Sequence, residues 1–440
     1  MKGTQVILTA VLFFFLTLSN LNQVFAKSLE EEVRELKTRV AELERKLAEE
    51  CTKTKRQEEV VSKHQTRIEH IDSHIKEYRI VGVEIAEGLK IGLGGTLVVQ
   101  GTPEANNTNT KDEGVTDAAY SIDLEIESEV GDNGLAFAHL ETGDGAGVED
   151  ELQLFSNVNR DADDSDNSVS LTELWYQHAL FGGQLNVKFG KIEACAHVDQ
   201  NAIANDEHVQ FLGRIFRNAS TIQFPDNGAG LRGILALEET PWFELEGQVL
   251  DGDADWEDIG DEIFTSGQVN LKPALIEDRE CNYRFYGWYK DTNHVEWKNS
   301  SNMKEENYGF GISADQELTD VVTIFGRYGW QNPEVYTSGA DFSLEHTWSA
   351  GAQIMGSPWG REEDCIGLAI GMEIPSDDYK DTQNRKGDNE GHLEAYYYCQ
   401  LNEHLSISPD FQLIWDAYGN DVSDREDTIY VFGSRAQVDF

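Results

Sequence analysis

The sequence lacks the motifs that identify common enzymes. It contains no HExxH, GxSxG or Walker A sequence, so zinc proteases, serine hydrolases and P-loop nucleotide-binding proteins have no support. The glycine run at residues 143–147 (GDGAG) lies in an acidic segment without a strand–turn–helix context, which favours a turn over a nucleotide site. A Ser–His pair of the kind found in barrel lipases has no sequence signature here. We predict that the protein is not an enzyme and needs no cofactor.

Cysteines are few, and their spacing matches no metal or redox motif. The five are Cys51, Cys195, Cys281, Cys365 and Cys399, and none belongs to a CxxC or CxxCH sequence. In an oxidising periplasm, the four that follow residue 80 have three possible connectivities. The sequence does not select one of them.

Long hydrophobic runs are also missing. Mean hydropathy is -0.48, and no apolar run near twenty residues follows the N-terminus, which excludes transmembrane helices. A transmembrane β-barrel remains possible, because its strands are only half apolar. The 39 glycines against 8 prolines suit a chain of many strands and tight turns.

Positive charge is scarce, and the net charge is -46. Residues 80–440 hold 21 basic against 68 acidic side chains, whereas residues 27–79 are balanced. A negative field of this size repels nucleic acid and anionic solutes. Two explanations stand at this point. The acidic side chains could keep extracellular loops soluble and adapted to salt, or they could form an electrostatic filter in a pore.

Two segments precede the main body of the chain. Residues 1–26 have the charged start, apolar stretch and small residues of a secretory signal peptide, with a short anchor helix as the alternative. Residues 27–79 carry a heptad repeat, and we expect a periplasmic coiled coil. In the middle of this segment, polar residues such as Glu50 and His64 occupy core positions. A single helix lying along another surface is the alternative. The core positions do not decide between a dimer and a trimer. The apolar core positions are Leu29, Val33, Leu36, Val40, Leu43, Leu47, Val61, Ile68, Ile71, Ile75 and Tyr78.

After Arg79 the apolar period changes from 3.5 to 2, which predicts strands. The last thirteen residues, 428–440 (TIYVFGSRAQVDF), place Tyr430 and Phe432 on one face and Arg435 on the other, and end in Phe440. Short turns such as 131–134 alternate with long polar connections, as in outer-membrane barrels. We predict an all-β fold over residues 80–440, an antiparallel barrel of about sixteen strands. The predicted strands include 122–127, 135–141, 171–180, 184–192, 231–237, 242–250, 282–289, 308–314, 321–330, 346–355, 366–374, 392–400 and 405–414.

Two segments carry candidate functional residues. Residues 199–218 break the strand alternation and place Arg214 and Arg217 close together, shortly after Lys191. If this segment folds into the barrel, these three residues would form a constriction where charged groups bind sugar hydroxyls; surface salt bridges are the alternative.

The second segment has the spacing of a calcium-binding loop. Asp251, Asp253, Asp255 and Glu262 occupy positions 1, 3, 5 and 12 of such a loop, but Trp256 stands where the sharp turn needs glycine. Weak calcium binding and a solvated acidic loop are the two interpretations.

Several segments together resemble the carbohydrate-selective porins of the OprB family. The resemblance spans most of residues 85–440, and it implies a sixteen-stranded outer-membrane barrel that admits sugars by passive diffusion. The long N-terminal coil and the large negative charge depart from the family pattern. The segments that carry the resemblance are 174–194 (LWYQHALFGGQLNVKFGKIEA), 202–211, 224–228, 348–368 (WSAGAQIMGSPWGREEDCIGL) and 392–440.

The sequence therefore predicts a porin in the outer membrane of a Gram-negative bacterium. Its partners would be small neutral sugars or other small solutes and outer-membrane lipid, with no nucleic acid, and its coil would join two or three copies. The alternatives are a general cation-preferring porin and a structural barrel that tethers the envelope and conducts only incidentally.

Overall fold

The structure of the protein is a computed structural model that describes residues 82–440, apart from 108–112, 160–166, 302, 304 and 422–426. The compact unit that contains them runs from Ile80 to Phe440. The predicted signal peptide (1–26) and coiled coil (27–79) lie outside the described residues and stay predictions.

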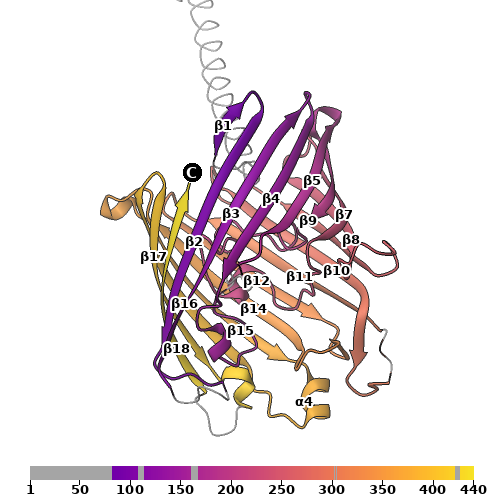
Figure 1. The fold of residues 1–440 in the computed structure, drawn as a ribbon, viewed down its shortest axis with the longest axis vertical. Coiled ribbons are helices and arrows are strands. Elements are labelled where there is room, and N and C mark those ends of the chain that lie inside the picture. Colours follow the sequence, from indigo (N-terminus) through magenta and orange to yellow (C-terminus); the bar gives the residue numbers. More distant parts are fainter. Residues whose placement is uncertain (1–81, 108–112, 160–166, 302, 304, 422–426) are drawn as a thin grey trace, which may run out of the picture. The chain divides into compact units, whose positions relative to one another are not determined.

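The described chain forms one antiparallel sheet that closes into a barrel (Figure 1). Sixteen strands make the ring, because β2 to β12 and β14 to β18 each pair with the next and β18 pairs with β2. Two short strands, β1 and β13, pair with β2 and β10. The predicted closed barrel of about sixteen strands is confirmed.

The strands connect through segments that contain only short helices. Within the described part of the chain, no helix is both long enough and apolar enough to cross a membrane. The helices are η2 (Glu149–Glu151), η3 (Phe181–Gly183), α3 (Arg214–Arg217), η4 (Ser357–Trp359), α4 (Asp377–Gln383) and η5 (Ala417–Asn420). The strands are β1 (Val83–Ala86), β2 (Leu89–Thr102), β3 (Val115–Val130), β4 (Gly134–Asp144), β5 (Ser170–Leu180), β6 (Leu185–Ile192), β7 (Gly228–Ala236), β8 (Phe243–Asp251), β9 (Ile263–Leu271), β10 (Cys281–Glu296), β11 (Glu305–Glu317), β12 (Val322–Gln331), β13 (Val335–Thr337), β14 (Leu344–Met355), β15 (Cys365–Pro375), β16 (Glu390–Asn402), β17 (Leu405–Trp415) and β18 (Thr428–Asp439).

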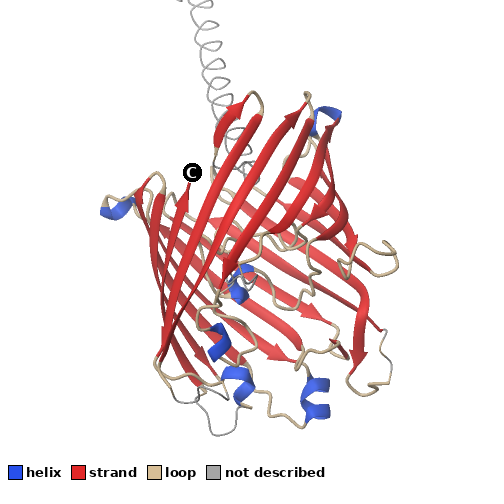
Figure 2. Ribbon diagram, viewed as in Figure 1, coloured by secondary structure: helices blue, strands red, loops and turns tan. Residues whose placement is uncertain are grey.

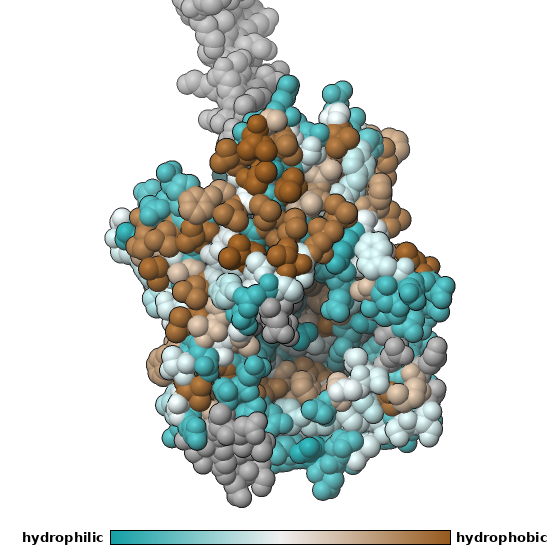
Figure 3. All heavy atoms as spheres, viewed as in Figure 1, coloured by the Kyte–Doolittle hydropathy of each residue, from teal (hydrophilic) through white to brown (hydrophobic). Residues whose placement is uncertain are grey.

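Side chains alternate between an apolar outer face and a lumen face that carries most of the polar groups. In β18, Tyr430 and Phe432 are 44% and 57% exposed, whereas Val431 and Arg435 are buried inside the barrel. The same alternation leaves large apolar side chains exposed on most other strands. Figure 3 shows hydrophobic residues gathered over the upper part of this face and hydrophilic residues toward the rim at the bottom. An apolar outer band of this kind suits lipid.

The two rims differ in the length of their connections. One rim has turns of two to nine residues, such as 131–133 between β3 and β4 and 403–404 between β16 and β17. The other rim has connections of eight to 35 residues, the longest being 145–169 and 193–227, and parts of these lie inside the barrel (Figure 2). The predicted alternation of short turns and long loops is confirmed.

The outer face generates a test of membrane insertion. Leu97 lies midway along β2 and is 47% exposed, whereas Phe181 lies in a short turn and is 77% exposed. Leu97→Arg should lower the free energy of unfolding by about 2–4 kcal/mol, because a guanidinium at the bilayer midplane is poorly solvated. Phe181→Arg, the matched control, should cost about 0–1 kcal/mol. Urea unfolding in lipid vesicles measures both, and equal losses would contradict the assignment of the lipid face.

Candidate functional site

The lumen is crossed by the connection between β6 and β7, residues 193–227, which we call the crossing loop. Figure 2 shows loop segments and short helices within the ring of strands. Side chains on the inner wall hydrogen-bond the backbone of the crossing loop from β8, β9, β11, β12, β16 and β18. Residues 199–218 therefore lie inside the barrel, which is the condition that the constriction hypothesis requires.

Arg327 on β12 makes the densest of these contacts. Its Nη1 donates to the carbonyl of Phe216 at 2.7 Å, and its Nη2 donates to those of Asp199 and Ala204 at 2.9 and 3.0 Å. Its Nε forms an ion pair with the Asp199 carboxylate at 2.8 Å, and both side chains are buried. The Asp199 carboxylate also accepts from the N–H of Ala219 at 2.6 Å. One guanidinium therefore fixes three separated points of the crossing loop.

Two further wall residues hold the loop where it turns into α3. Glu394 on β16 accepts from the N–H groups of Leu212 and Gly213 at 2.6 and 2.9 Å. A Cβ on Gly213 would lie 2.8 Å from the Glu394 Oε2, so a larger residue here would displace the carboxylate from its two N–H donors. Arg435 on β18 donates to the carbonyls of Glu207 and Gln210, a few residues before α3.

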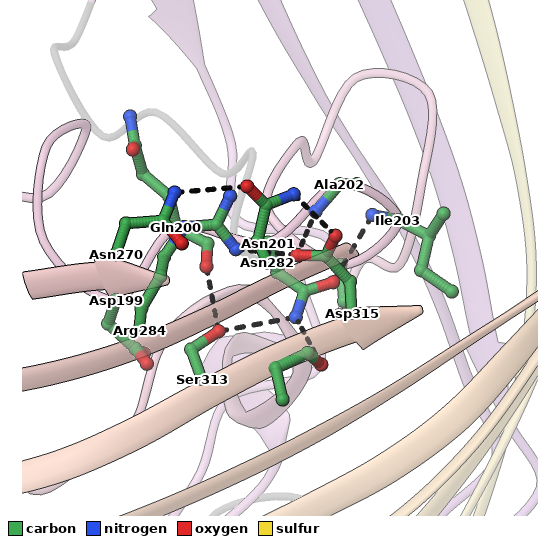
Figure 4. Close-up of polar contacts among 12 residues, drawn as sticks. Asp199, Gln200, Asn201, Ala202, Ile203, Asn270, Asn282, Arg284, Ser313 and Asp315 are labelled. Carbon is green, nitrogen blue, oxygen red and sulfur yellow. Dashed lines mark hydrogen bonds and ion pairs between the residues drawn. The ribbon is translucent and has the colours of Figure 1, made fainter. Parts of the chain in front are cut away.

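A row of polar side chains on β9, β10 and β11 supports the start of the crossing loop (Figure 4). Asp315 accepts from Asn282 at 2.8 Å and from Arg284 at 2.5 Å, and it also accepts from the Ala202 N–H at 3.3 Å. Ser313 donates to the carbonyl of Gln200 at 2.7 Å. Buried polar groups are stable only when they find such partners, so this row positions the loop and is not free to bind solute.

The connection between β4 and β5 also turns inward and meets the crossing loop. Glu390 on β16 accepts from the N–H groups of Phe155 and Ser156, and Gln412 on β17 donates to the carbonyl of Val158 at 2.8 Å. The N–H of Ile215 in α3 donates to the Ser156 hydroxyl at 3.2 Å. The two loops therefore form one hydrogen-bonded body inside the barrel.

The inner wall of β3, β4 and β5 is strongly acidic, and we call it the acidic wall. In the sheet, His139 lies opposite Glu125 on β3 and Glu173 on β5, and Asp123 lies opposite Glu141. His139 Nε2 is 2.9 Å from the Asp123 carboxylate. Asp123 and Glu141 lie directly opposite each other on neighbouring strands, where like charges repel.

The three residues predicted for the constriction occupy different environments. Arg214 begins α3 inside the barrel and is exposed. Arg217 ends the same helix but is buried, where it contacts Glu193, Glu207 and the Sγ of Cys195. Only Arg214 of this pair can meet solute.

Lys191 lies outside this constriction. Inward-facing Lys188 and Ile192 of β6 are buried, so alternation places Lys191 on the outer face with exposed Phe189. Its Nζ donates to the carbonyl of Leu171 at 2.7 Å. Lys191 therefore does not line the predicted constriction. The sequence alone did not assign which side chains of this strand face the lumen.

The predicted calcium residues are partly brought together. Asp251, Asp253 and Asp255 each offer a ligand oxygen, and these oxygens lie within 4.8 Å of one another, whereas Glu262 is not part of the group. Asp123, His139 and Glu141 form a second such group on the acidic wall. The four described cysteines are free thiols.

The anchoring residues Arg327, Glu394 and Glu390 were not predicted as functional. Each stands at an inward position of a strand, where it interrupts no apolar alternation and resembles any other lumen-facing polar residue. Their partners are far away in sequence. The one sequence feature that could have identified these anchors is an ionisable residue at a lumen-facing strand position.

Two carboxyl groups in the inward loops are affected by burial. Burial raises the pKa of Glu149, in η2, to about 7, against the opposing effect of the N–H groups of Val158 and Asn159. Burial also raises the pKa of Asp199 to about 6, although Arg327 opposes the shift. Both loops therefore hold acids that take up protons more readily than free carboxyl groups.

These features define the class of the protein. A closed sixteen-stranded barrel with an apolar outer band, a polar lumen and inward loops is the architecture of an outer-membrane diffusion porin. Residues 281–440 match the family model described as carbohydrate-selective porin, OprB family. The predicted resemblance to that family is confirmed over residues 281–440 by this match.

The fold is similar to solved porin structures at low sequence identity. Pseudomonas putida OprB at high pH shares 15% identity with a TM-score of 0.67, covering 80% of this chain and 94% of that one. Its low-pH structure has 15% identity and a TM-score of 0.50, with 80% and 93% covered. The outer-membrane channel DcaP of Acinetobacter baumannii has 12% identity and a TM-score of 0.51, with 82% and 100% covered. No curated protein matches the chain by sequence.

The buried carboxyl of Glu149 generates a pH prediction. Its pKa is higher in the docked loop than in a solvent-exposed one, so protonation favours docking. That contribution is fully present below about pH 4.5 and is lost as the pH rises through about 7. Amide hydrogen exchange of residues 145–159, corrected for intrinsic rates, should therefore show less protection at pH 8 than at pH 5.

Glu149→Gln should remove most of this pH dependence and keep the pH 5 protection at pH 8. Glu104→Gln, on an exposed side chain between β2 and β3, is the matched control and should behave like the unmodified protein. If Glu149→Gln retained the full pH dependence, another group would control the loop.

Proposed function

We propose that the barrel is a passive diffusion channel for small hydrophilic solutes, among them neutral carbohydrates, and that it conducts cations in preference to anions. It would act in this way without catalysing a reaction. The observation that carries the proposal is that two loops, residues 145–169 and 193–227, turn into the lumen and narrow it. The acidic wall of β3, β4 and β5 lines the same lumen. Agreement with the carbohydrate-selective porin family supports the solute class.

Charge supports the preference for cations. Asp123, Glu125, Glu141 and Glu173 surround the single imidazole of His139 on the acidic wall. Unit charges near a water-filled pore interact by about 1–4 kcal/mol at contact, less when salt screens them. Such an energy favours cations over anions several-fold and leaves neutral solutes unaffected.

Arg214 is the residue that we propose to line the constriction. It is exposed on α3, at the point where the two inward loops meet, and it interacts electrostatically with Glu149 and Glu373. A guanidinium between carboxylates offers donors and acceptors to sugar hydroxyls. Arg217 has the supporting role of holding α3 through its buried contacts with Glu193 and Glu207.

Planar bilayers and liposome swelling test these proposals. In a salt gradient, the reversal potential should have the sign of a cation-preferring channel, and graded neutral sugars should enter liposomes at rates that fall with size. Arg214→Ala should raise conductance and cation preference, because it removes a bulky positive charge from the constriction. Arg279→Ala, in a short turn outside the lumen, is the matched control.

The outcomes separate the candidate functions. Anion preference would contradict the electrostatic proposal, and equal effects of Arg214→Ala and Arg279→Ala would remove Arg214 from the constriction. Cation conductance without size-dependent sugar entry would favour a general cation-preferring porin, an alternative that the excess of acidic residues supports. If the protein showed neither cation conductance nor size-dependent sugar entry, a structural barrel would be favoured.

For the N-terminal part we propose a periplasmic coiled coil that joins two or three copies of the protein. The support is the heptad pattern of residues 29–78, which follows the predicted signal peptide and precedes the first strand. Cys51 lies near the predicted seam, so mild oxidation should give a cross-linked dimer that Cys51→Ser abolishes. Deletion of residues 29–78 should reduce the oligomer in detergent, and an unchanged oligomer size would exclude the coil as its cause.

A further inference from the structure

The loop between β8 and β9, residues 252–262, carries a group of carboxylates that the channel function does not use. Asp251 is the last residue of β8, and Asp253 and Asp255 follow it. Ligand oxygens of all three lie within 4.8 Å of one another. Asp253 and Asp255 are exposed, whereas Asp251 is 2% exposed.

The buried member of the group has an oxygen with no donor. Asp251 Oδ2 accepts from the N–H of Trp256 at 3.2 Å. Its Oδ1 is buried and has no hydrogen-bond partner among the described residues. A buried carboxylate oxygen without a partner costs free energy, and two neighbouring carboxylates increase the cost by repulsion. A bound cation would remove both penalties.

We propose that Asp251, Asp253 and Asp255 bind a calcium ion at the long-loop rim of the barrel. Three carboxylates without a thiol or imidazole form a hard-oxygen donor set, which suits Ca²⁺. Ca²⁺ accepts irregular geometry and completes its shell with water and carbonyl oxygens, whereas Mg²⁺ demands near-octahedral geometry. The ligand spacing in the sequence, at positions 1, 3 and 5, agrees with this assignment.

The neighbouring residues set the strength of the site. Glu262, the twelfth position, stands outside the group, so the bidentate ligand of a full calcium loop is missing. Lys290 on β10 interacts electrostatically with Asp253 and Glu262, and it neutralises part of the local charge. The affinity should therefore be that of weak extracellular sites, with a Kd of about 10⁻⁴–10⁻³ M.

Trp256 provides a local probe. It follows Asp255 directly, so its indole can transfer excitation energy to Tb³⁺ bound at these carboxylates. The purified full-length protein in detergent, excited at the tryptophan band, should show Tb³⁺ emission. Ca²⁺ should displace Tb³⁺ with a midpoint that reflects a Kd of about 10⁻⁴–10⁻³ M, and Mg²⁺ at the same concentrations should not.

Variants separate this site from the many other acidic groups of the barrel. The double substitution Asp253→Asn with Asp255→Asn changes only exposed side chains and should weaken Tb³⁺ binding by about tenfold or more, because affinity depends on the charge of the ligands. Asp261→Asn removes a charge from the same loop and should leave binding unchanged. Trp256→Phe should abolish the emission while calorimetry still detects Ca²⁺ binding.

Two results would overturn the proposal. One is equal Tb³⁺ emission from the double variant and from Asp261→Asn; the other is failure of Ca²⁺ to displace Tb³⁺ at millimolar concentration. Neither result depends on conductance, so the site is tested separately from the channel function.

Discussion

The contact of Arg327 with the crossing loop determines how the lumen is organised. A closed barrel satisfies its own backbone hydrogen bonds, but a loop inside it does not, and must find partners on the wall. Arg327 supplies donors to three loop carbonyls and pairs with Asp199. A guanidinium buried in this way is stable only when its donors are nearly all used. The loop and the wall residue therefore require each other.

The same requirement limits how much of the net charge reaches the pore. Glu390 and Glu394 each accept at least two loop N–H groups, and Asp315 pairs with Arg284, so these acids act as structural acceptors. On the acidic wall, Glu173 accepts from the Trp175 indole N–H and the Glu193 N–H, and Asp123 contacts His139. The formal charge of -46 consequently overstates the field along the solute path. That field depends chiefly on the few acids that still face water.

Strand alternation could be predicted from the sequence, whereas loop contacts could not. The outward faces of β18 and of the β3–β4 hairpin follow from Tyr430, Phe432 and the 122–127 pattern, because lipid selects apolar residues at every second position. In β2, glycines at 92, 94 and 95 obscure that pattern. Lys191 was misplaced because a shift of one residue moves a side chain to the other face. Arg327 and Ala204, 123 residues apart, meet only through the closed topology.

The distribution of anchors also affects the mechanics of the barrel. Wall contacts to the crossing loop come from β9, β11, β12, β16 and β18, which lie on separated parts of the ring. A loop tied to several walls resists both its own displacement and a flattening of the barrel around it. Each neutral hydrogen bond contributes only about 1 kcal/mol, and each bond to a charged group about 1.5–3 kcal/mol. Because opening the loop breaks many of them together, the crossing loop is a rigid part of the lumen.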